Sequence, residues 1–174
     1  CYIQYMKIAI DIRAATGNRT GKGQYVFNLL RAILKQDTKN DYLLYTKDKI
    51  AGFESFKNAK FVAIRGKSLS WHFKVLKDLS NRNVDIFWAP SSYILPALLP
   101  SRIKSVITVH DLVAFLFPDS HNKKATVIEK IFLKRACKKA TKILAVSKNT
   151  KKDLLEHFEL DSEKIEVIYC AASE

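Results

Sequence analysis

A short apolar strand that leads directly into a glycine-containing turn and an amphipathic helix opens this chain. The strand covers residues 7–12, and the turn that follows covers residues 16–24. This order is the first unit of a doubly wound sheet, in which ligands bind beyond the carboxyl ends of the strands. We therefore expect a ligand site near Gly21 and Gly23.

Extended and helical patterns alternate along the rest of the chain, which favours parallel strands joined by crossover helices. The predicted strands are residues 7–12, 42–46, 60–65, 84–89, 105–109, 142–146 and 164–169. The predicted helices are residues 22–35, 70–81, 123–140 and 147–157, with Ser147 placed to cap the last one. The expected fold class is α/β, with a doubly wound, mostly parallel sheet and helices on both faces, in one compact unit.

The glycine-containing turn has some features of a phosphate-binding loop but does not match one. A P-loop needs four residues between its first glycine and the Gly-Lys pair, followed by Ser or Thr. Here three residues separate Gly17 from Gly21, and Gly23 takes the place of the hydroxyl residue. A dinucleotide fingerprint also fails, because its third glycine would fall at Val26. Two interpretations stay open: close approach of an anion to the helix start, or a plain flexible turn.

A histidine and an aspartate directly follow the predicted strand at residues 105–109. Both should lie at the carboxyl edge of the sheet, where open α/β sheets bind ligands. His110 can donate hydrogen bonds to a sugar or phosphate, or exchange a proton near neutral pH, and Asp111 can orient a hydroxyl or the imidazole. The alternative is an Asx turn at the strand end with a satisfied histidine.

Positive charge dominates the chain. Lys and Arg number 30 against 17 Asp and Glu, which gives a net charge of +13 and favours a polyanionic neighbour. The predicted helices at residues 70–81 and 123–140 are basic and amphipathic. They fit either contact with an anionic membrane surface or a core stripe with solvated lysines. The sequence has no recognition-helix, zinc or base-stacking motif, so no nucleic-acid partner is predicted.

The cysteines indicate a reducing compartment. Cys1, Cys137 and Cys170 form no C-x-x-C pair, which supports neither a disulfide framework nor a metal site. The most apolar segment outside the predicted elements, residues 93–100, is broken by prolines, so neither a signal peptide nor a spanning helix is predicted. We expect a cytoplasmic location, with any membrane contact peripheral, at the inner face of the membrane.

Six short segments follow one another along nearly the whole chain. They are residues 8–13, 19–25 (Arg-Thr-Gly-Lys-Gly-Gln-Tyr), 84–90 (Val-Asp-Ile-Phe-Trp-Ala-Pro), 108–112 (Thr-Val-His-Asp-Leu), 145–148 (Ala-Val-Ser-Lys) and 164–168 (Lys-Ile-Glu-Val-Ile). Each segment alone is a modest signal. In this order and spacing they resemble the amino-terminal domain of a family 4 (group 1) glycosyltransferase.

The resemblance implies a Rossmann-like half of a GT-B enzyme, in which two such domains face each other across a cleft. Such enzymes move a sugar from a nucleotide sugar to a glycan or lipid-linked acceptor, with retention at the anomeric carbon. They need no metal and no cofactor, because the nucleotide sugar is a co-substrate. The amino-terminal domain mainly holds the acceptor.

The resemblance also implies roles for individual residues. His110 would contact the transferring sugar, and Asp111 would support that edge of the sheet. The remaining candidates would bind substrate, either beside the donor diphosphate and the acceptor or at the border of the cleft. They are Gly21, Lys22, Gly23 and Ser147.

The expected domain organisation follows the same resemblance. Residues 1–6 are an N-terminal extension, residues 7–170 the acceptor-side domain, and residues 171–174 the start of an interdomain linker. The family's donor-binding motifs belong to a second domain that this sequence does not contain, so we expect the 174-residue chain alone to be inactive. The alternative is a standalone basic binding module, at a membrane surface or in a split enzyme.

Overall fold

A single seven-stranded sheet forms the centre of the molecule. The computed structural model describes residues 5–116 and 123–171, so most of the expected extension (residues 1–4) and of the expected linker start (172–174) lie outside the described residues. All strand pairs are parallel, and the strand order is β3-β2-β1-β4-β5-β6-β7. The predicted α/β class with a doubly wound parallel sheet is therefore confirmed.

The observed strands fall close to the predicted ones. They are β1 (Lys7–Asp11), β2 (Asp41–Thr46), β3 (Ala59–Ala63), β4 (Ile86–Ala89), β5 (Lys104–Val109), β6 (Lys142–Ala145) and β7 (Ile165–Val167). The four predicted helices are present as α1 (Gly21–Gln36), α2 (Ser68–Ser80), α5 (Lys123–Lys139) and α6 (Lys148–His157). The last strand is shorter than predicted, because the chain leaves the sheet after β7.

Within the described residues, four short helical segments were not predicted. They are η1 (Arg13–Ala15), α3 (Ile94–Leu98), α4 (Val113–Leu116) and η3 (Ser162–Lys164). The proline-containing segment around Pro96 forms α3 rather than a loop, since a proline in the first turn of a helix breaks no hydrogen bond. The other three are only three or four residues long, too short to show a helical period.

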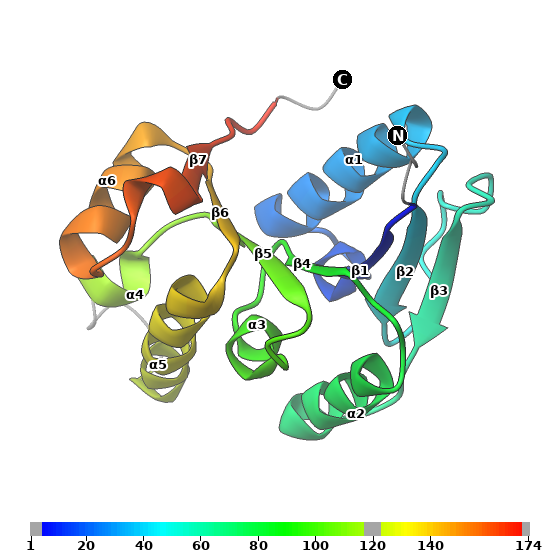
Figure 1. Cartoon of the computed structure of the whole chain (residues 1–174), viewed down its shortest axis with the longest axis horizontal. Coiled ribbons are helices and arrows are strands. Elements are labelled where there is room, and N and C mark those ends of the chain that lie inside the picture. Colours follow the sequence, from blue (N-terminus) through cyan, green and yellow to red (C-terminus); the bar gives the residue numbers. More distant parts are fainter. Residues whose placement is uncertain (1–4, 117–122, 172–174) are drawn as a thin grey trace.

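Helices cover the two faces of the sheet unequally (Figure 1). On one face, α1 packs its buried residues, such as Val26 and Leu30, against Ile10, Leu44 and Trp88. The other face carries α2, α3, α5 and α6 over a second core cluster. Crossovers in a parallel sheet bring every strand end to a common carboxyl edge, so the turns after β1, β4, β5 and β6 lie along one rim.

Candidate functional site

The predicted site residues lie on three elements that meet at the carboxyl edge of the sheet. His110 and Asp111 follow the last residue of β5, Lys22 lies in the first turn of α1, and Ser147 follows β6. Contacts connect all three elements. The structure therefore brings the predicted residues together, although it assigns them different local tasks.

His110 is held on two sides. Its Nε2 lies 2.8 Å from the carbonyl oxygen of Pro90, and the Tyr25 ring meets the imidazole edge-on, with 4.9 Å between ring centroids. Because a carbonyl only accepts, Nε2 carries the proton and donates it. Burial lowers the pKa of His110 below its usual 6.5, and the nearby charge of Lys22 acts in the same direction, while the bond to Pro90 and the charge of Asp111 oppose it. At neutral pH the imidazole is uncharged.

The second imidazole nitrogen is available to a ligand. In the neutral tautomer with a proton on Nε2, Nδ1 carries a lone pair and accepts hydrogen bonds. Among the residues that the structure describes, none bonds to Nδ1 of His110. Such an atom can accept a hydrogen bond from a sugar hydroxyl.

Asp111 forms the Asx turn that the sequence left open, while its role in orienting a hydroxyl or the imidazole stays a prediction. Its Oδ1 accepts a hydrogen bond from the backbone N of Val113 at 3.3 Å, which is the Asx turn. Its Oδ2 lies 3.4 Å from Nζ of Lys22, and both side chains are about 40% exposed (43% and 42%). Exposed ion pairs of this kind contribute about 0–1 kcal/mol. The pair therefore positions Lys22 more than it stabilises the fold.

The two glycines at the start of α1 differ in function. Both lie in the first helical turn, because α1 begins at Gly21, one residue before the predicted start. A Cβ on Gly23 would lie 2.3 Å from the carbonyl oxygen of Ala14, so Gly23 permits close packing of α1 on η1. A Cβ on Gly21 would meet nothing within 4 Å. Only Gly21 leaves the helix start open to a ligand.

The start of α1 is also a positive pole. Thr20 occupies the N-cap position but its side chain makes no capping hydrogen bond, and the first turn contains no acidic residue. The first backbone N–H groups of a helix have no carbonyl one turn earlier, so they are available to an anion. Together with Lys22, they form a site suited to a phosphate.

Ser147 is a helix cap, as predicted. Its Oγ accepts a hydrogen bond from the backbone N of Thr150 at 3.0 Å. The Thr150 hydroxyl in turn donates to the carbonyl oxygen of His110 at 3.3 Å. Ser147 is thus linked to His110 through Thr150, and its direct contact with a substrate stays a prediction.

A second polar cluster at the same edge was not predicted. Arg13 makes two side-chain hydrogen bonds to buried Asp11, at 2.9 Å and 2.7 Å. Its Nη2 also donates to Nε2 of His72 at 3.2 Å, and its guanidinium lies 3.7 Å from the centre of the Trp71 ring. The closeness of Asp11 and Arg13 in the sequence was a usable signal. Nothing in the sequence indicated that α2 would supply the other two residues.

Metal ligands are not grouped in the described part of the chain. Within residues 5–116 and 123–171, no set of three His, Cys, Asp or Glu side chains could hold a metal ion. The described groups suited to a ligand are instead a cation, free amides and a neutral imidazole. These groups fit an anion and hydroxyls.

Comparison with known proteins gives the family. The sequence pattern of Glycosyltransferase Family 4 matches residues 19–173. The O-antigen chain mannosyltransferase RfbU of Salmonella typhimurium strain LT2 is 38% identical over 71 residues, which cover 41% of this chain and 20% of the relative.

Two solved structures share the fold over nearly the whole chain. The lipopolysaccharide outer core galactosyltransferase WaaB has a TM-score of 0.57 at 14% identity, with 97% of this chain and 46% of that chain covered. An alpha-glucosyltransferase in complex with UDP and a 13-mer DNA has a TM-score of 0.53 at 16% identity, with 95% and 42% covered. The chain thus spans less than half the length of each of these proteins. With the family pattern matched over most of its residues, the chain belongs to glycosyltransferase family 4.

Proposed function

We propose that this chain is the acceptor-side domain of a retaining, metal-independent glycosyltransferase of the GT-B type. It would act with a second, donor-binding domain to move a sugar from a nucleotide sugar to a glycan or lipid-linked acceptor. The family membership and the share of each relative that the chain spans support this proposal. The UDP bound by the structurally similar alpha-glucosyltransferase supports a nucleotide diphosphate as the leaving group.

One observation carries the proposal: a neutral His110 lies beside a cationic, uncapped helix start. Two contacts join them: Tyr25 of α1 lies against the His110 ring, with 4.9 Å between ring centroids, and Nζ of Lys22 lies 3.4 Å from Oδ2 of Asp111, the residue after His110. A sugar nucleotide has hydroxyls on the sugar and negative charge on the diphosphate. This edge offers a hydrogen-bond acceptor, Nδ1 of His110, to the hydroxyls, and it offers hydrogen-bond donors, Lys22 and the first amides of α1, to the diphosphate. The pairing of these two chemistries at one edge distinguishes the site from a plain anion-binding turn.

The chemistry assigns each group a role. Nδ1 of His110 would accept a hydrogen bond from a hydroxyl of the transferring sugar, which orients the anomeric carbon. Lys22 and the first amides of α1, at Gly21, would face the charge that develops on the departing phosphate. Asp111 would hold Lys22 in place, and Gly23 would fix the angle at which α1 meets the sheet.

A neutral His110 does not act as a general acid in this proposal. An imidazole with a lowered pKa is mostly unprotonated at neutral pH, and its one proton is already donated to Pro90. Its contribution is therefore positioning, by a hydrogen bond to the sugar. Charge stabilisation comes from Lys22 and from the helix start.

The proposal is tested by transfer of a radiolabelled sugar from a nucleotide sugar to an acceptor extract, with two forms of the protein. We expect turnover by the complete two-domain protein and none by residues 1–174 alone. Mixing the 174-residue chain with a separately produced donor domain should restore part of the activity. Robust turnover by residues 1–174 alone would contradict the division of labour between two domains.

A location follows from the same proposal. The enzyme would act in the cytoplasm and, with a lipid-linked acceptor, at the inner face of the membrane as a peripheral protein. Among the residues that the structure describes, no helix has the length and apolarity to cross a bilayer.

A further inference from the structure

The backbone of His110 is held by two elements. Strand β5 ends at the preceding residue, Val109, and the carbonyl oxygen of His110 accepts a hydrogen bond from the Thr150 hydroxyl at 3.3 Å. A fixed backbone leaves only the side-chain torsions of His110 free. The direction of Nδ1, the atom proposed to meet the sugar, therefore depends on what holds the imidazole ring.

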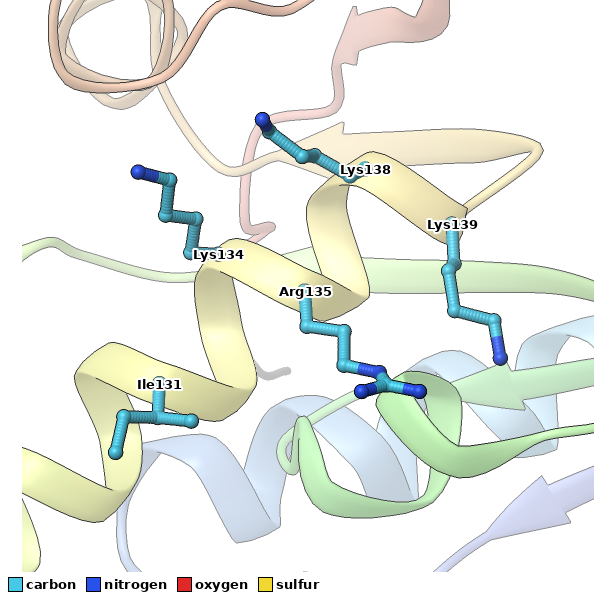
Figure 2. Close-up of a pocket in the computed structure, with 5 residues that line it drawn as sticks. All are labelled: Ile131, Lys134, Arg135, Lys138 and Lys139. Carbon is cyan, nitrogen blue, oxygen red and sulfur yellow. The ribbon is translucent and has the colours of Figure 1, made fainter.

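One end of the ring is bonded to the segment between β4 and α3. Nε2 donates to the carbonyl oxygen of Pro90 at 2.8 Å, and the end of α3 is itself tied to α5. Arg135 Nε donates to the carbonyl oxygen of Ala97 at 2.8 Å. Lys139 Nζ donates to the carbonyl oxygen of Leu99. Figure 2 shows both basic side chains pointing from α5 to the side on which α3 lies. Pro90 thus belongs to a segment that other elements hold in place.

This hydrogen bond alone does not fix the plane of the ring. The torsion about the Cβ–Cγ bond of histidine has a broad range, because it joins a tetrahedral carbon to a planar one. Nδ1 lies farther from the axis of that rotation than Nε2 does. A rotation that Nε2 can tolerate therefore moves Nδ1 over a larger distance.

Tyr25 of α1 supplies the missing restraint on the plane. The centroid of its ring lies 4.9 Å from that of the imidazole, and the two planes meet at 87°. This is the edge-to-face arrangement that aromatic rings prefer, and rotation of the imidazole would break it. The Tyr25 ring is partly buried and packs against the core cluster that contains Ile10 and Trp88. The core therefore fixes the ring that fixes the imidazole.

The ring of Tyr25 makes this contact without help from its hydroxyl. The hydroxyl oxygen is buried and has no hydrogen-bond partner among the described residues. Burial raises the pKa of the hydroxyl above its usual 10, while nearby Thr108 acts in the opposite direction. The group is therefore uncharged at neutral pH. Because a buried hydroxyl without a partner does not stabilise a fold, phenylalanine should replace Tyr25 without loss.

Tyr25 also lies on the helix whose start would bind the diphosphate. Gly21 and Lys22 precede it by four and three residues, a spacing that places all three on one face of α1. The contact with the imidazole thus connects the element proposed to bind the phosphate with the residue proposed to bind the sugar.

We propose that Tyr25 is a positioning residue for His110: its ring fixes the plane of the imidazole, so that Nδ1 is directed at the transferring sugar. Tyr25 does not touch the reacting atoms and acts only through His110. The identity of the ligand rests on the proposed function. The contact between the two rings does not, and it is measured without turnover.

Two substitutions at Tyr25 in the two-domain enzyme proposed above test this role. Tyr25→Leu removes the ring, and Tyr25→Phe removes only the hydroxyl. Transfer is measured with the radiolabelled UDP- or GDP-sugar that the enzyme turns over fastest. We expect kcat to fall about tenfold in Tyr25→Leu, the size of a strong aromatic contact, with KM for the nucleotide sugar changed less than about twofold. Tyr25→Phe should keep kcat within about twofold of the unsubstituted enzyme.

Phe56→Leu is the matched control for loss of an aromatic ring. Phe56 is also partly buried and packs against the same core cluster as Tyr25, with its ring centroid 6.3 Å from that of Phe53. It lies beside β3, and three strands separate β3 from β5. Phe56→Leu should lower Tm about as much as Tyr25→Leu does and leave kcat unchanged.

NMR titration of His110 gives a measurement that does not depend on turnover. Among the described residues, the charged groups that act on the imidazole are Lys22 and Asp111, and Tyr25→Leu removes neither. Burial is the main cause of the lowered pKa of His110, so Tyr25→Leu should raise that pKa toward 6.5. Tyr25→Phe and Phe56→Leu should leave it unchanged.

Three results would overturn the inference. They are a kcat of Tyr25→Leu within about twofold of the unsubstituted enzyme, equal losses of kcat in Tyr25→Leu and Tyr25→Phe, and an equal loss in Phe56→Leu. A pKa of His110 that is the same in all variants, in an enzyme that transfers sugar, would also overturn it and leave the proposed function standing. If no form of the protein transfers sugar, yet the pKa rises in Tyr25→Leu alone, the contact between the rings is supported and only the proposed function fails.

Discussion

Two polar clusters at the carboxyl edge of the sheet contain similar residue types but differ in how well their groups are satisfied. In the cluster of Asp11, Arg13, Trp71 and His72, the guanidinium binds a carboxylate, an imidazole and a ring face. In the cluster around His110, the closest ion pair is 3.4 Å long and exposed. The charged groups of the first cluster are paired within the protein, although the buried Nε1 of Trp71 has no hydrogen-bond partner among the described residues. The second cluster leaves polar groups without a partner among the same residues.

The difference separates a structural cluster from a binding site. Asp11 is 1% exposed and is held by Arg13 on both carboxylate oxygens, so its charge already has a partner. Nδ1 of His110 and the first amides of α1 have none among the described residues. Charged residues at a sheet edge therefore indicate a site only when their bonding capacity is incomplete.

The largest effect is expected in the satisfied cluster. Asp11→Ala should lower the free energy of unfolding by about 3 kcal/mol, because it leaves Arg13 partly buried without its carboxylate. Chemical denaturation measures the loss. Glu156→Ala, which removes an exposed i, i+4 partner of Lys152, is the control and should change stability by less than about 0.5 kcal/mol. A loss for Asp11→Ala as small as that of the control would show that the first cluster is not structural.

The two glycines of α1 sharpen the comparison within one helical turn. Gly23→Ala should destabilise the protein by about 2 kcal/mol, because its Cβ would collide with the backbone of Ala14. Gly21→Ala should leave stability unchanged or raise it by up to about 1 kcal/mol, while weakening binding of a nucleotide diphosphate. Thermal unfolding of the full protein measures the change in stability, and isothermal titration measures its affinity for the nucleotide diphosphate. Equal destabilisation by the two substitutions would contradict the assignment of Gly21 to the ligand.

The smallest effect concerns the protonation of His110. Its pKa is lowered by burial first and by Lys22 as well, so the folded protein binds this proton less readily than the unfolded chain does. The contribution of the neutral His110 to the free energy of unfolding is therefore fully present above its ordinary pKa of 6.5. It is lost as the pH falls toward the lower pKa of the folded state. NMR titration should give a pKa below 6.5, and Lys22→Ala should raise it. If the pKa of His110 were unchanged in Lys22→Ala, Lys22 would be too far from His110 to act with it.

The sequence predicts the sheet well because each strand carries its own signal. Apolar runs mark β5 and β6, and the rule that parallel strands share a carboxyl edge places His110 beside the start of α1. Ser147 as a cap is a local property and was also predictable. The strand and cap signals depend on neighbours within a few residues, and the shared carboxyl edge follows from the parallel sheet.

The features that the sequence did not predict depend on distant contacts. The contact of Arg13 with His72 joins residues 59 positions apart, and the bond from His110 to Pro90 joins residues 20 positions apart. The packing requirement at Gly23 comes from the carbonyl of Ala14, which no pattern of side chains reveals. A glycine required for packing and a glycine that faces open space have the same letter in the sequence.

The central claim is that the His110 cluster binds substrate while the Asp11 cluster supports the fold. The most direct test measures turnover and thermal stability of His110→Ala in the two-domain enzyme proposed above, with a substitution of the exposed α6 histidine, His157→Ala, as the control. We expect turnover to fall about 100-fold, or about 2.7 kcal/mol in the activation barrier, with little change in Tm, and no loss in the control. Equal losses of turnover and stability in His110→Ala would contradict the account.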